Sequence, residues 1–196
     1  MGRYYMQRLA LVALVGLVGL VSLELYFRYR RIKLLEVGEF ERQALEVVQT
    51  KVPSREWEYI IIHHTGTREG RLEDFKEFHT KERGWEDVGY HFVINNGESL
   101  PDGFIEVSDR WRFQRIGAHT RKEGVNNKAI GVALVGDFDK DYPRDGQLEA
   151  LVALLRALQT KYRIPKRRIL CHSMVQRTRC PGDRFPFDLV LLELSR

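Results

Sequence analysis

The order of apolar and polar positions along the chain predicts a domain built from alternating strands and helices. A β-branched and aromatic run over 57–62 predicts a buried strand, and a second buried strand is expected over 129–135. Between 145 and 162, leucines recur at helical spacing, which predicts a long amphipathic helix. Shorter segments complete the pattern: helices over 71–83 and 187–194, and strands over 90–94, 103–107, 112–116 and 168–171. This alternation predicts a single α/β domain with a central mixed β-sheet flanked by helices.

The first 33 residues form a segment of a different kind. Positions 9–27 are almost wholly apolar, and Glu24 is their only charge. At 1.5 Å per residue such a helix spans about 28 Å, close to the thickness of a bilayer's hydrocarbon core. No small-x-small cleavage site closes the run, so an uncleaved transmembrane anchor over residues 1–33 is favoured over a cleaved signal peptide. Positive residues flank both ends and leave the orientation open.

A short stretch separates this segment from the expected domain. Its apolar positions follow a helical period, and Pro53 ends the pattern. We therefore expect a juxtamembrane spacer helix over 34–55 and the folded domain over 56–196.

Composition narrows the choice of function only slightly. The chain has 196 residues, 43% of them hydrophobic, with a net charge of +5 and a pI near 9.3. The excess of positive charge would favour an anionic partner such as nucleic acid. The sequence contains no nucleic-acid-binding motif, however, so we expect no nucleic-acid binding. Two cysteines, Cys171 and Cys180, are too few for a disulfide scaffold, although one disulfide is possible in an exported domain.

Candidate metal ligands follow two of the predicted strands. His63 and His64 come directly after 57–62, His172 follows 168–171, and Cys180 comes eight residues later. Neighbouring strand residues point to opposite faces, so His63 and His64 do not easily share one metal. Two imidazoles and a thiolate suit Zn²⁺, and three protein ligands leave a fourth position open, as in catalytic sites. From the residues alone, buried histidines and a free core cysteine are the simpler explanation.

Five segments share their order and spacing with a known family. They are IIIHHTGT at 60–67, RGWEDVGYHFVI at 83–94, GAHTR at 117–121, IGVALVGDF at 130–138 and CHSMVQRTRCPG at 171–182. Together they resemble the zinc-dependent N-acetylmuramoyl-L-alanine amidases, a family that includes peptidoglycan recognition proteins and amidase-type phage lysozymes. The resemblance covers about residues 56–188 and does not extend to the N-terminal segment.

The resemblance implies a set of site residues. The family's zinc ligands fall on His63, His172 and Cys180, so the resemblance selects the first histidine of the pair. Its catalytic tyrosine falls on Tyr90, and the position two before the cysteine is Thr178, as in catalytic recognition proteins. Three further residues are expected at the substrate or behind the ligands: His64, His119 and Asn126.

The function implied by the resemblance is hydrolysis of the amide between N-acetylmuramic acid and L-alanine of peptidoglycan. Bound Zn²⁺ would lower the pKa of a water molecule to about 7 and polarise the carbonyl, while Tyr90 and Thr178 hydrogen-bond the developing oxyanion. The alternative is a membrane-tethered peptidoglycan sensor with little or no catalysis. We expect a monomer anchored by residues 1–33, with its domain facing the periplasm or the cell exterior, an orientation inferred from the substrate.

Overall fold

Residues 38–196 are the part of the chain that the computed structural model describes. The anchor expected over residues 1–33 lies outside the described residues. Within 38–196, no helix has both the length and the apolar character needed to cross a membrane. Phe40–Arg196 forms one folded unit.

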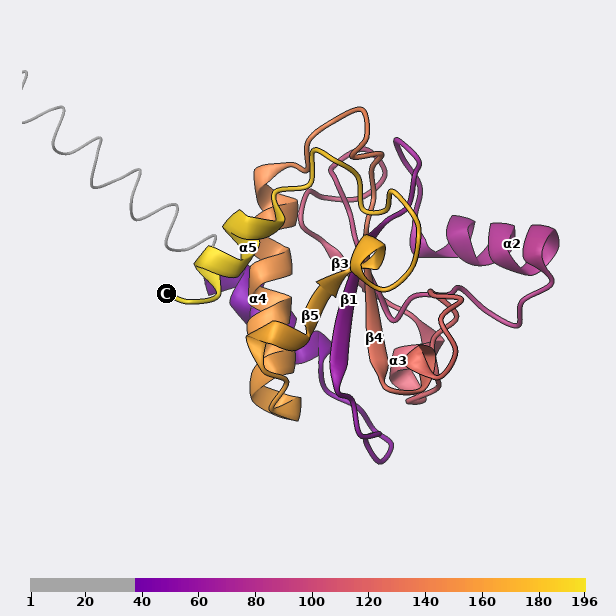
Figure 1. Ribbon diagram of the computed structural model, residues 1–196, viewed down its shortest axis with the longest axis horizontal. Coiled ribbons are helices and arrows are strands. Elements are labelled where there is room, and N and C mark those ends of the chain that lie inside the picture. Colours follow the sequence, from indigo (N-terminus) through magenta and orange to yellow (C-terminus); the bar gives the residue numbers. More distant parts are fainter. Residues whose placement is uncertain (1–37) are drawn as a thin grey trace, which may run out of the picture. The chain divides into compact units, whose positions relative to one another are not determined.

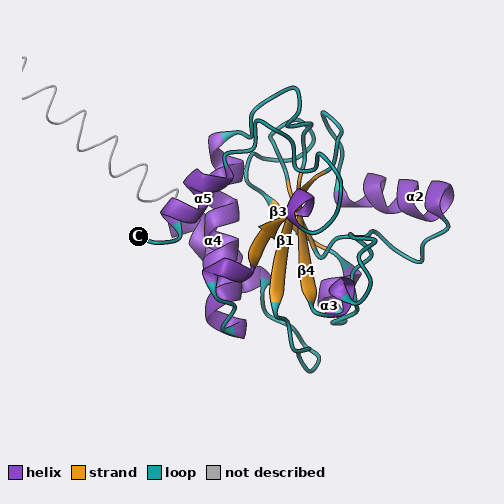
Figure 2. Cartoon of the chain, in the orientation of Figure 1, coloured by secondary structure: helices purple, strands orange, loops and turns teal. Residues whose placement is uncertain are grey.

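A five-stranded sheet lies at the centre of this unit (Figures 1 and 2). Its strands are β1 (Tyr59–His64), β2 (Phe92–Ile94), β3 (Ile105–Val107), β4 (Ala129–Leu134) and β5 (Ile169–Cys171). Their order is β3-β2-β4-β1-β5. The pairs β1–β4, β1–β5 and β2–β4 are parallel, and β2–β3 is antiparallel. The α/β class and the mixed sheet predicted from the sequence are confirmed.

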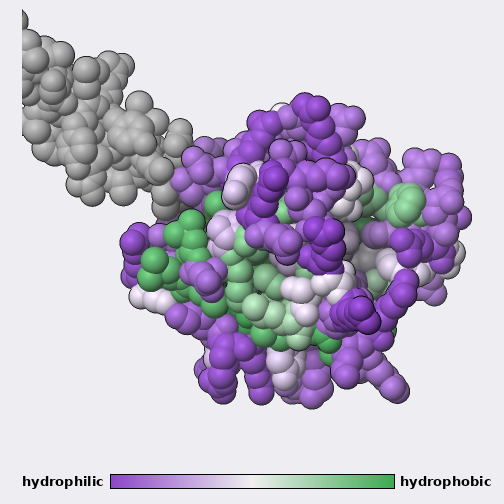
Figure 3. All heavy atoms as spheres, turned by 45° about the horizontal axis from the view of Figure 1, so that its top comes forward, coloured by the Kyte–Doolittle hydropathy of each residue, from purple (hydrophilic) through white to green (hydrophobic). Residues whose placement is uncertain are grey.

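Helices pack against both faces of the sheet. On one face lie α4 (Asp145–Tyr162) and α5 (Phe187–Glu193), while α2 (Leu72–Arg83) extends from the opposite side (Figure 1). The bounds of α4 are those expected from the leucine spacing. Apolar surface gathers mainly on the side of α4 and α5, and the loops at the top of the molecule are mostly hydrophilic (Figure 3).

The strand expected over 112–116 is wrong. The chain there forms the short helix α3 (Asp109–Arg112) and then a turn in which Gln114 has a φ of 51°. Local hydrogen bonds from the amides of Trp111 to Ser108 and of Phe113 to Asp109 hold this shape. The two apolar residues of this segment face solvent instead of a sheet, since Phe113 is 54% and Ile116 is 41% exposed.

Strand pleating gives the two faces of the sheet different environments. Ile60 and Ile62 of β1 belong to the large core that α4 covers. His63 therefore faces the opposite side, where it is also buried. On that face, β4 places Gly131 opposite Ile61 and Ala133 opposite His63. These small residues leave space beside His63 for other side chains.

The helix through residues 38–47 packs on the same core as α4. Ala44 and Val48 are buried there. The indole of Trp111 donates to the carbonyl of Val47 at 2.9 Å, and the amide of Ile105 donates to Gln43 at 3.1 Å. From Phe40 onward, the segment expected as a spacer thus contributes to the folded unit.

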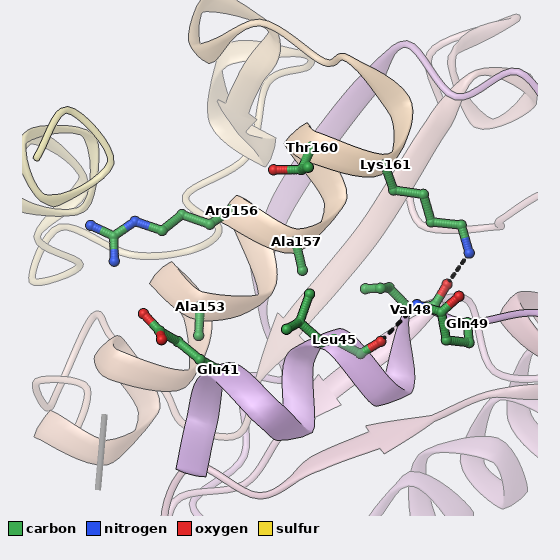
Figure 4. Close-up of a pocket in the computed structure, with 9 residues that line it drawn as sticks. All are labelled: Glu41, Leu45, Val48, Gln49, Ala153, Arg156, Ala157, Thr160 and Lys161. Atoms are coloured by element: carbon green, nitrogen blue, oxygen red, sulfur yellow. Dashed lines mark hydrogen bonds between the residues drawn. The ribbon is translucent and has the colours of Figure 1, made fainter. Parts of the chain in front are cut away.

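A shallow groove of about 380 Å³ runs between this helix and α4 (Figure 4). Leu45 lies opposite Ala157 in it, and Lys161 donates to the carbonyl of Val48 at 2.5 Å. The groove is remote from the residues singled out by the sequence.

Candidate metal centre

Three side chains from separate parts of the chain converge at one end of the sheet. They are His63 of β1, His172 at the start of the short helix η3 (His172–Met174), and Cys180 in the loop before α5. One ligand atom from each lies within 4.8 Å of the others. The parallel pairing of β1 with β5 explains the meeting of the two histidines, because both strands end at the same edge. The structure thus brings the three expected ligands together.

The distances within this ligand cluster are short. Sγ of Cys180 lies 3.7 Å from Nδ1 of His63. The ring centroids of His63 and His172 are 4.3 Å apart. Among the described residues, Nε2 of His172 is buried without a hydrogen-bond partner. An unpaired buried nitrogen is costly, and a bond to a metal would satisfy it, so two imidazoles and a thiol fit a zinc ion here.

Burial fixes the protonation states of the cluster. Desolvation lowers the pKa of His63 well below its usual 6.5, and the neighbouring rings of His119 and His172 lower it further. Burial also lowers the pKa of His172, so both imidazoles are neutral at pH 7, as metal ligands must be. Burial raises the pKa of Cys180 to about 12, so a metal must displace the thiol proton.

His64 faces away from the cluster, as strand pleating predicts. Its Nδ1 accepts a hydrogen bond from the amide of Phe138 at 3.2 Å. Its own amide donates to Sγ of Cys180 at 3.4 Å, a contact that favours the thiolate and opposes the effect of burial. The backbone amide of His64 therefore hydrogen-bonds the cluster, whereas its ring is bonded to the amide of Phe138.

His119 lies directly behind His63. Its Nδ1 is 3.1 Å from Nε2 of His63, and its Nε2 is 3.2 Å from the carbonyl oxygen of Ala129. Burial lowers the pKa of His119 to about 4, so the ring is neutral. Asn126 does not reach the cluster, and its side chain bonds the backbone of His119 and Thr120 instead.

Tyr90 and Thr178 border the cluster in different ways. The ring of Tyr90 packs beside His63, and burial raises the pKa of its hydroxyl, which stays protonated. The hydroxyl of Thr178 accepts a hydrogen bond from the amide of Cys180 at 3.3 Å. Thr178 therefore shapes the loop that carries the cysteine.

A cleft of about 430 Å³ opens beside the cluster. Its lining residues are His79, Arg83, Trp85, Tyr90, Ala118, His119, Thr120, Arg121, His172, Gln176, Arg177 and Thr178. Aromatic rings form part of this wall, and three exposed arginines, Arg83, Arg121 and Arg177, add positive charge without any carboxylate among the lining residues. Sequence reasoning missed these arginines and Gln176, because they come from the end of α2 and from two loops, which no periodic pattern connects.

Comparison with known proteins gives a consistent family assignment. Residues 53–183 match the family model of N-acetylmuramoyl-L-alanine amidase (Amidase_2). The chain is 35% identical over 136 residues to Peptidoglycan-recognition protein LB of Drosophila melanogaster, covering 64% of this chain and 55% of that protein. It is 32% identical over 145 residues to Endolysin of Enterobacteria phage T3, covering 70% of this chain and 85% of the endolysin. The chain thus spans about half the length of the Drosophila protein.

Solved structures show the same likeness. The Endolysine N-acetylmuramoyl-L-alanine amidase LysCS from Clostridium intestinale URNW is similar at a TM-score of 0.59 and 33% identity, covering 71% of this chain and 84% of that chain. Peptidoglycan recognition protein-LE, solved in complex with tracheal cytotoxin, has a TM-score of 0.59 and 27% identity, covering 70% of this chain and 82% of that chain.

Proposed function

Because the chain belongs to the N-acetylmuramoyl-L-alanine amidase family, we propose that it hydrolyses the amide bond between N-acetylmuramic acid and L-alanine of peptidoglycan. The observation that carries this proposal is the convergence of His63, His172 and Cys180 within 4.8 Å, beside a cleft that His172 lines. Zinc dependence is part of the proposal, since two neutral imidazoles and a thiol are a donor set that Zn²⁺ prefers.

Each side chain at the site has a role in this reaction. When held by the three ligands, Zn²⁺ would polarise the scissile carbonyl and activate a water molecule as the nucleophile. The protonated hydroxyl of Tyr90 borders the cluster and would donate a hydrogen bond to the oxygen that becomes negative. One such donor is worth about 3 kcal/mol. Thr178 positions the Cys180 loop through its bond to the Cys180 amide.

The products follow from the addition of water across the C–N bond. The lactyl group of the sugar gains the oxygen and becomes a carboxylate, and the proton of water completes the free amine of L-alanine. The arginines Arg83, Arg121 and Arg177 at the cleft support a substrate of this kind, because a stem peptide carries free carboxylates that guanidinium groups bind well.

The test uses the full chain incubated with soluble muropeptides. Mass spectrometry should show release of the stem peptide, loss of release with a chelator, and recovery with added zinc. Cys180→Ala should abolish release. Cys171→Ala is the matched control, because Cys171 is buried in β5 outside the ligand cluster. Wild-type protein that holds zinc but releases no stem peptide would contradict the proposal.

A peptidoglycan sensor without turnover is the second candidate. It is favoured by the likeness to recognition proteins, one of which was solved with a bound muropeptide toxin. A sensor would bind muropeptides with the same affinity whether or not zinc is present, and Tyr90→Phe would not alter its response. Binding measured by calorimetry beside release measured by mass spectrometry separates the two functions.

For the setting of this activity, we propose that residues 1–33 anchor the chain in a membrane and that the domain faces the periplasm or the cell exterior. The support is the apolar run over 9–27, which is long enough to span a bilayer, together with the location of peptidoglycan. We also propose a monomer. Membrane fractionation after alkaline extraction tests the anchor, protease protection tests the orientation, and sedimentation in detergent tests the monomer.

A further inference from the structure

A loop at residues 117–121 contacts one imidazole of the ligand cluster, that of His63, through His119. We propose that this positioning loop fixes the tautomer of His63, so that its Nδ1 faces Cys180 without a proton. The inference rests on the proposed function, since it assigns a metal to the ligand cluster. His119 is a positioning residue, because it acts through the ligand His63 and not on the substrate.

The hydrogen bonds of His119 decide which nitrogen of His63 carries the proton. The carbonyl oxygen of Ala129 only accepts hydrogen bonds, so Nε2 of His119, 3.2 Å away, carries the proton. In the neutral ring, Nδ1 is then an acceptor. It lies 3.1 Å from Nε2 of His63, which must therefore be the donor. The free lone pair of His63 is left on Nδ1, the atom 3.7 Å from Sγ of Cys180.

The side chain of Gln176 also contacts the positioning loop. Oε1 of Gln176 accepts from the hydroxyl of Thr120 at 2.9 Å and from the amide of Arg121 at 2.7 Å. These bonds tie the loop that carries His119 to the segment that follows His172.

Close packing holds the ring of His119 in place. A Cβ atom built on Gly131 would lie 2.5 Å from Cδ2 of His119, and one on Gly117 would lie closer still. Neither glycine has a positive φ, so space rather than backbone conformation requires glycine at both positions. Asn126 adds rigidity, because its side chain accepts from the amides of His119 and Thr120 and donates to the carbonyl of Thr120 at 2.7 Å.

The direct test is the tautomer of His63 in the zinc-free full chain. Long-range ¹H–¹⁵N correlation spectra at pH 7 should show its Nε2–H form. The opposite form at His63 would overturn the inference without any variant. This readout depends on neither activity nor zinc, so it stands apart from a failure of the proposed amidase function.

Variants at His119 supply the second test, with zinc affinity measured by chelator competition. His119→Phe keeps a ring of similar shape but removes the acceptor, and zinc affinity should fall about 10- to 100-fold. His119→Asn places an oxygen near the position of Nδ1 and should restore most of the affinity. The control is His79→Phe, because His79 lines the same cleft but bonds the amide of Gly89 instead of a ligand.

The outcomes of these variants are distinct. Wild-type zinc affinity in His119→Phe, with His63 still in the Nε2–H form, would overturn the positioning role. A fall in affinity shared by His119→Phe and His119→Asn would also overturn it, because the effect would then follow from packing rather than from the acceptor. Protein that binds zinc as expected but releases no stem peptide would contradict the amidase function alone.

Discussion

The ring of Tyr90 packs beside the ring of His63, with centroids 5.2 Å apart and planes inclined by 50°. The two residues are separated by 27 positions in the sequence. His63 lies in β1, and Tyr90 comes two residues before β2; both strands are paired with β4. The sheet thus holds a proton donor next to a candidate ligand, in a place where burial keeps the phenol protonated.

We predict that Tyr90→Phe lowers kcat about 100- to 1000-fold and leaves zinc affinity unchanged. The phenylalanine ring keeps the packing against His63, so only the hydrogen-bond donor is lost. The measurement is the rate of stem-peptide release at saturating muropeptide. Tyr142→Phe is the control, because Tyr142 is 71% exposed. An unchanged kcat in Tyr90→Phe would remove the hydroxyl from the mechanism.

We predict that Gly131→Ala weakens zinc binding although it touches no ligand directly. The new methyl group would overlap the ring of His119 and displace it from His63. Overpacking of this kind also costs about 1–3 kcal/mol of stability. Chelator competition and urea unfolding measure the two effects. Gly38→Ala is the control, because a Cβ there meets nothing within 4 Å.

A double variant separates the clash from any other effect of the alanine. In His119→Ala the slot beside Gly131 is empty, so adding Gly131→Ala should cost little further stability. The two substitutions should therefore be strongly non-additive, as expected for side chains in direct contact. Additive losses would show that Gly131 is required for a reason other than the ring of His119.

We predict that the metal-free protein loses stability as the pH falls from 6.5 towards 4. Burial lowers the pKa of His119 to about 4 and that of His91 well below 6.5, whereas both rings take up protons near pH 6.5 in the unfolded chain. The unfolded state therefore binds more protons in this range, and stability is complete only above it. For each buried ring, the free energy of unfolding should fall by about 2 kcal/mol between pH 7 and pH 5.

Urea unfolding with a chelator present measures this pH dependence. His91→Gln should reduce the slope, because it removes one of the buried rings. Equal stability at pH 5 and pH 7 would mean that these histidines take up protons as readily in the folded protein as in the unfolded chain.

We predict that Gln147→Met lowers the free energy of unfolding by about 1–3 kcal/mol. The buried side chain of Gln147 donates to the carbonyls of Val135 and Ile94, at 2.9 and 3.2 Å. In the variant, the carbonyl of Ile94 keeps a hydrogen bond from the amide of Val135. The carbonyl of Val135 loses the donor that Gln147 supplied. Gln49→Met, at an exposed position, should change stability by less than about 0.5 kcal/mol. Equal effects of the two variants would contradict this account.

The elements with strong periodicity were the ones that the sequence predicted well. The leucines of α4 repeat on one face, and the residues of β4 alternate between large and small, so burial and pattern agree. The segment over 112–116 has only two apolar residues, Phe113 and Ile116, both exposed, and local hydrogen bonds turn the chain there instead of extending it. The spacing of apolar residues alone does not reveal where local hydrogen bonds will turn the chain.

The candidate site was predicted less completely than the fold. The order of motifs identified the three ligand residues, but the support for their orientation comes from contacts that span long sequence separations. Gln176 meets Thr120, and His119 meets His63, 56 residues away in each case. The sequence does not show why glycine is required at positions 117 and 131. The reason is that a side chain at either position would overlap the ring of His119, whose location only the structure gives.

The helix through residues 38–47 begins the folded unit ahead of the segment that matches the family, which starts at residue 53. Ala44 and Val48 of this helical segment are buried in the same core as α4. Any tension on the chain ahead of Phe40 is therefore borne first by this helix, not by β1 and the ligand it carries.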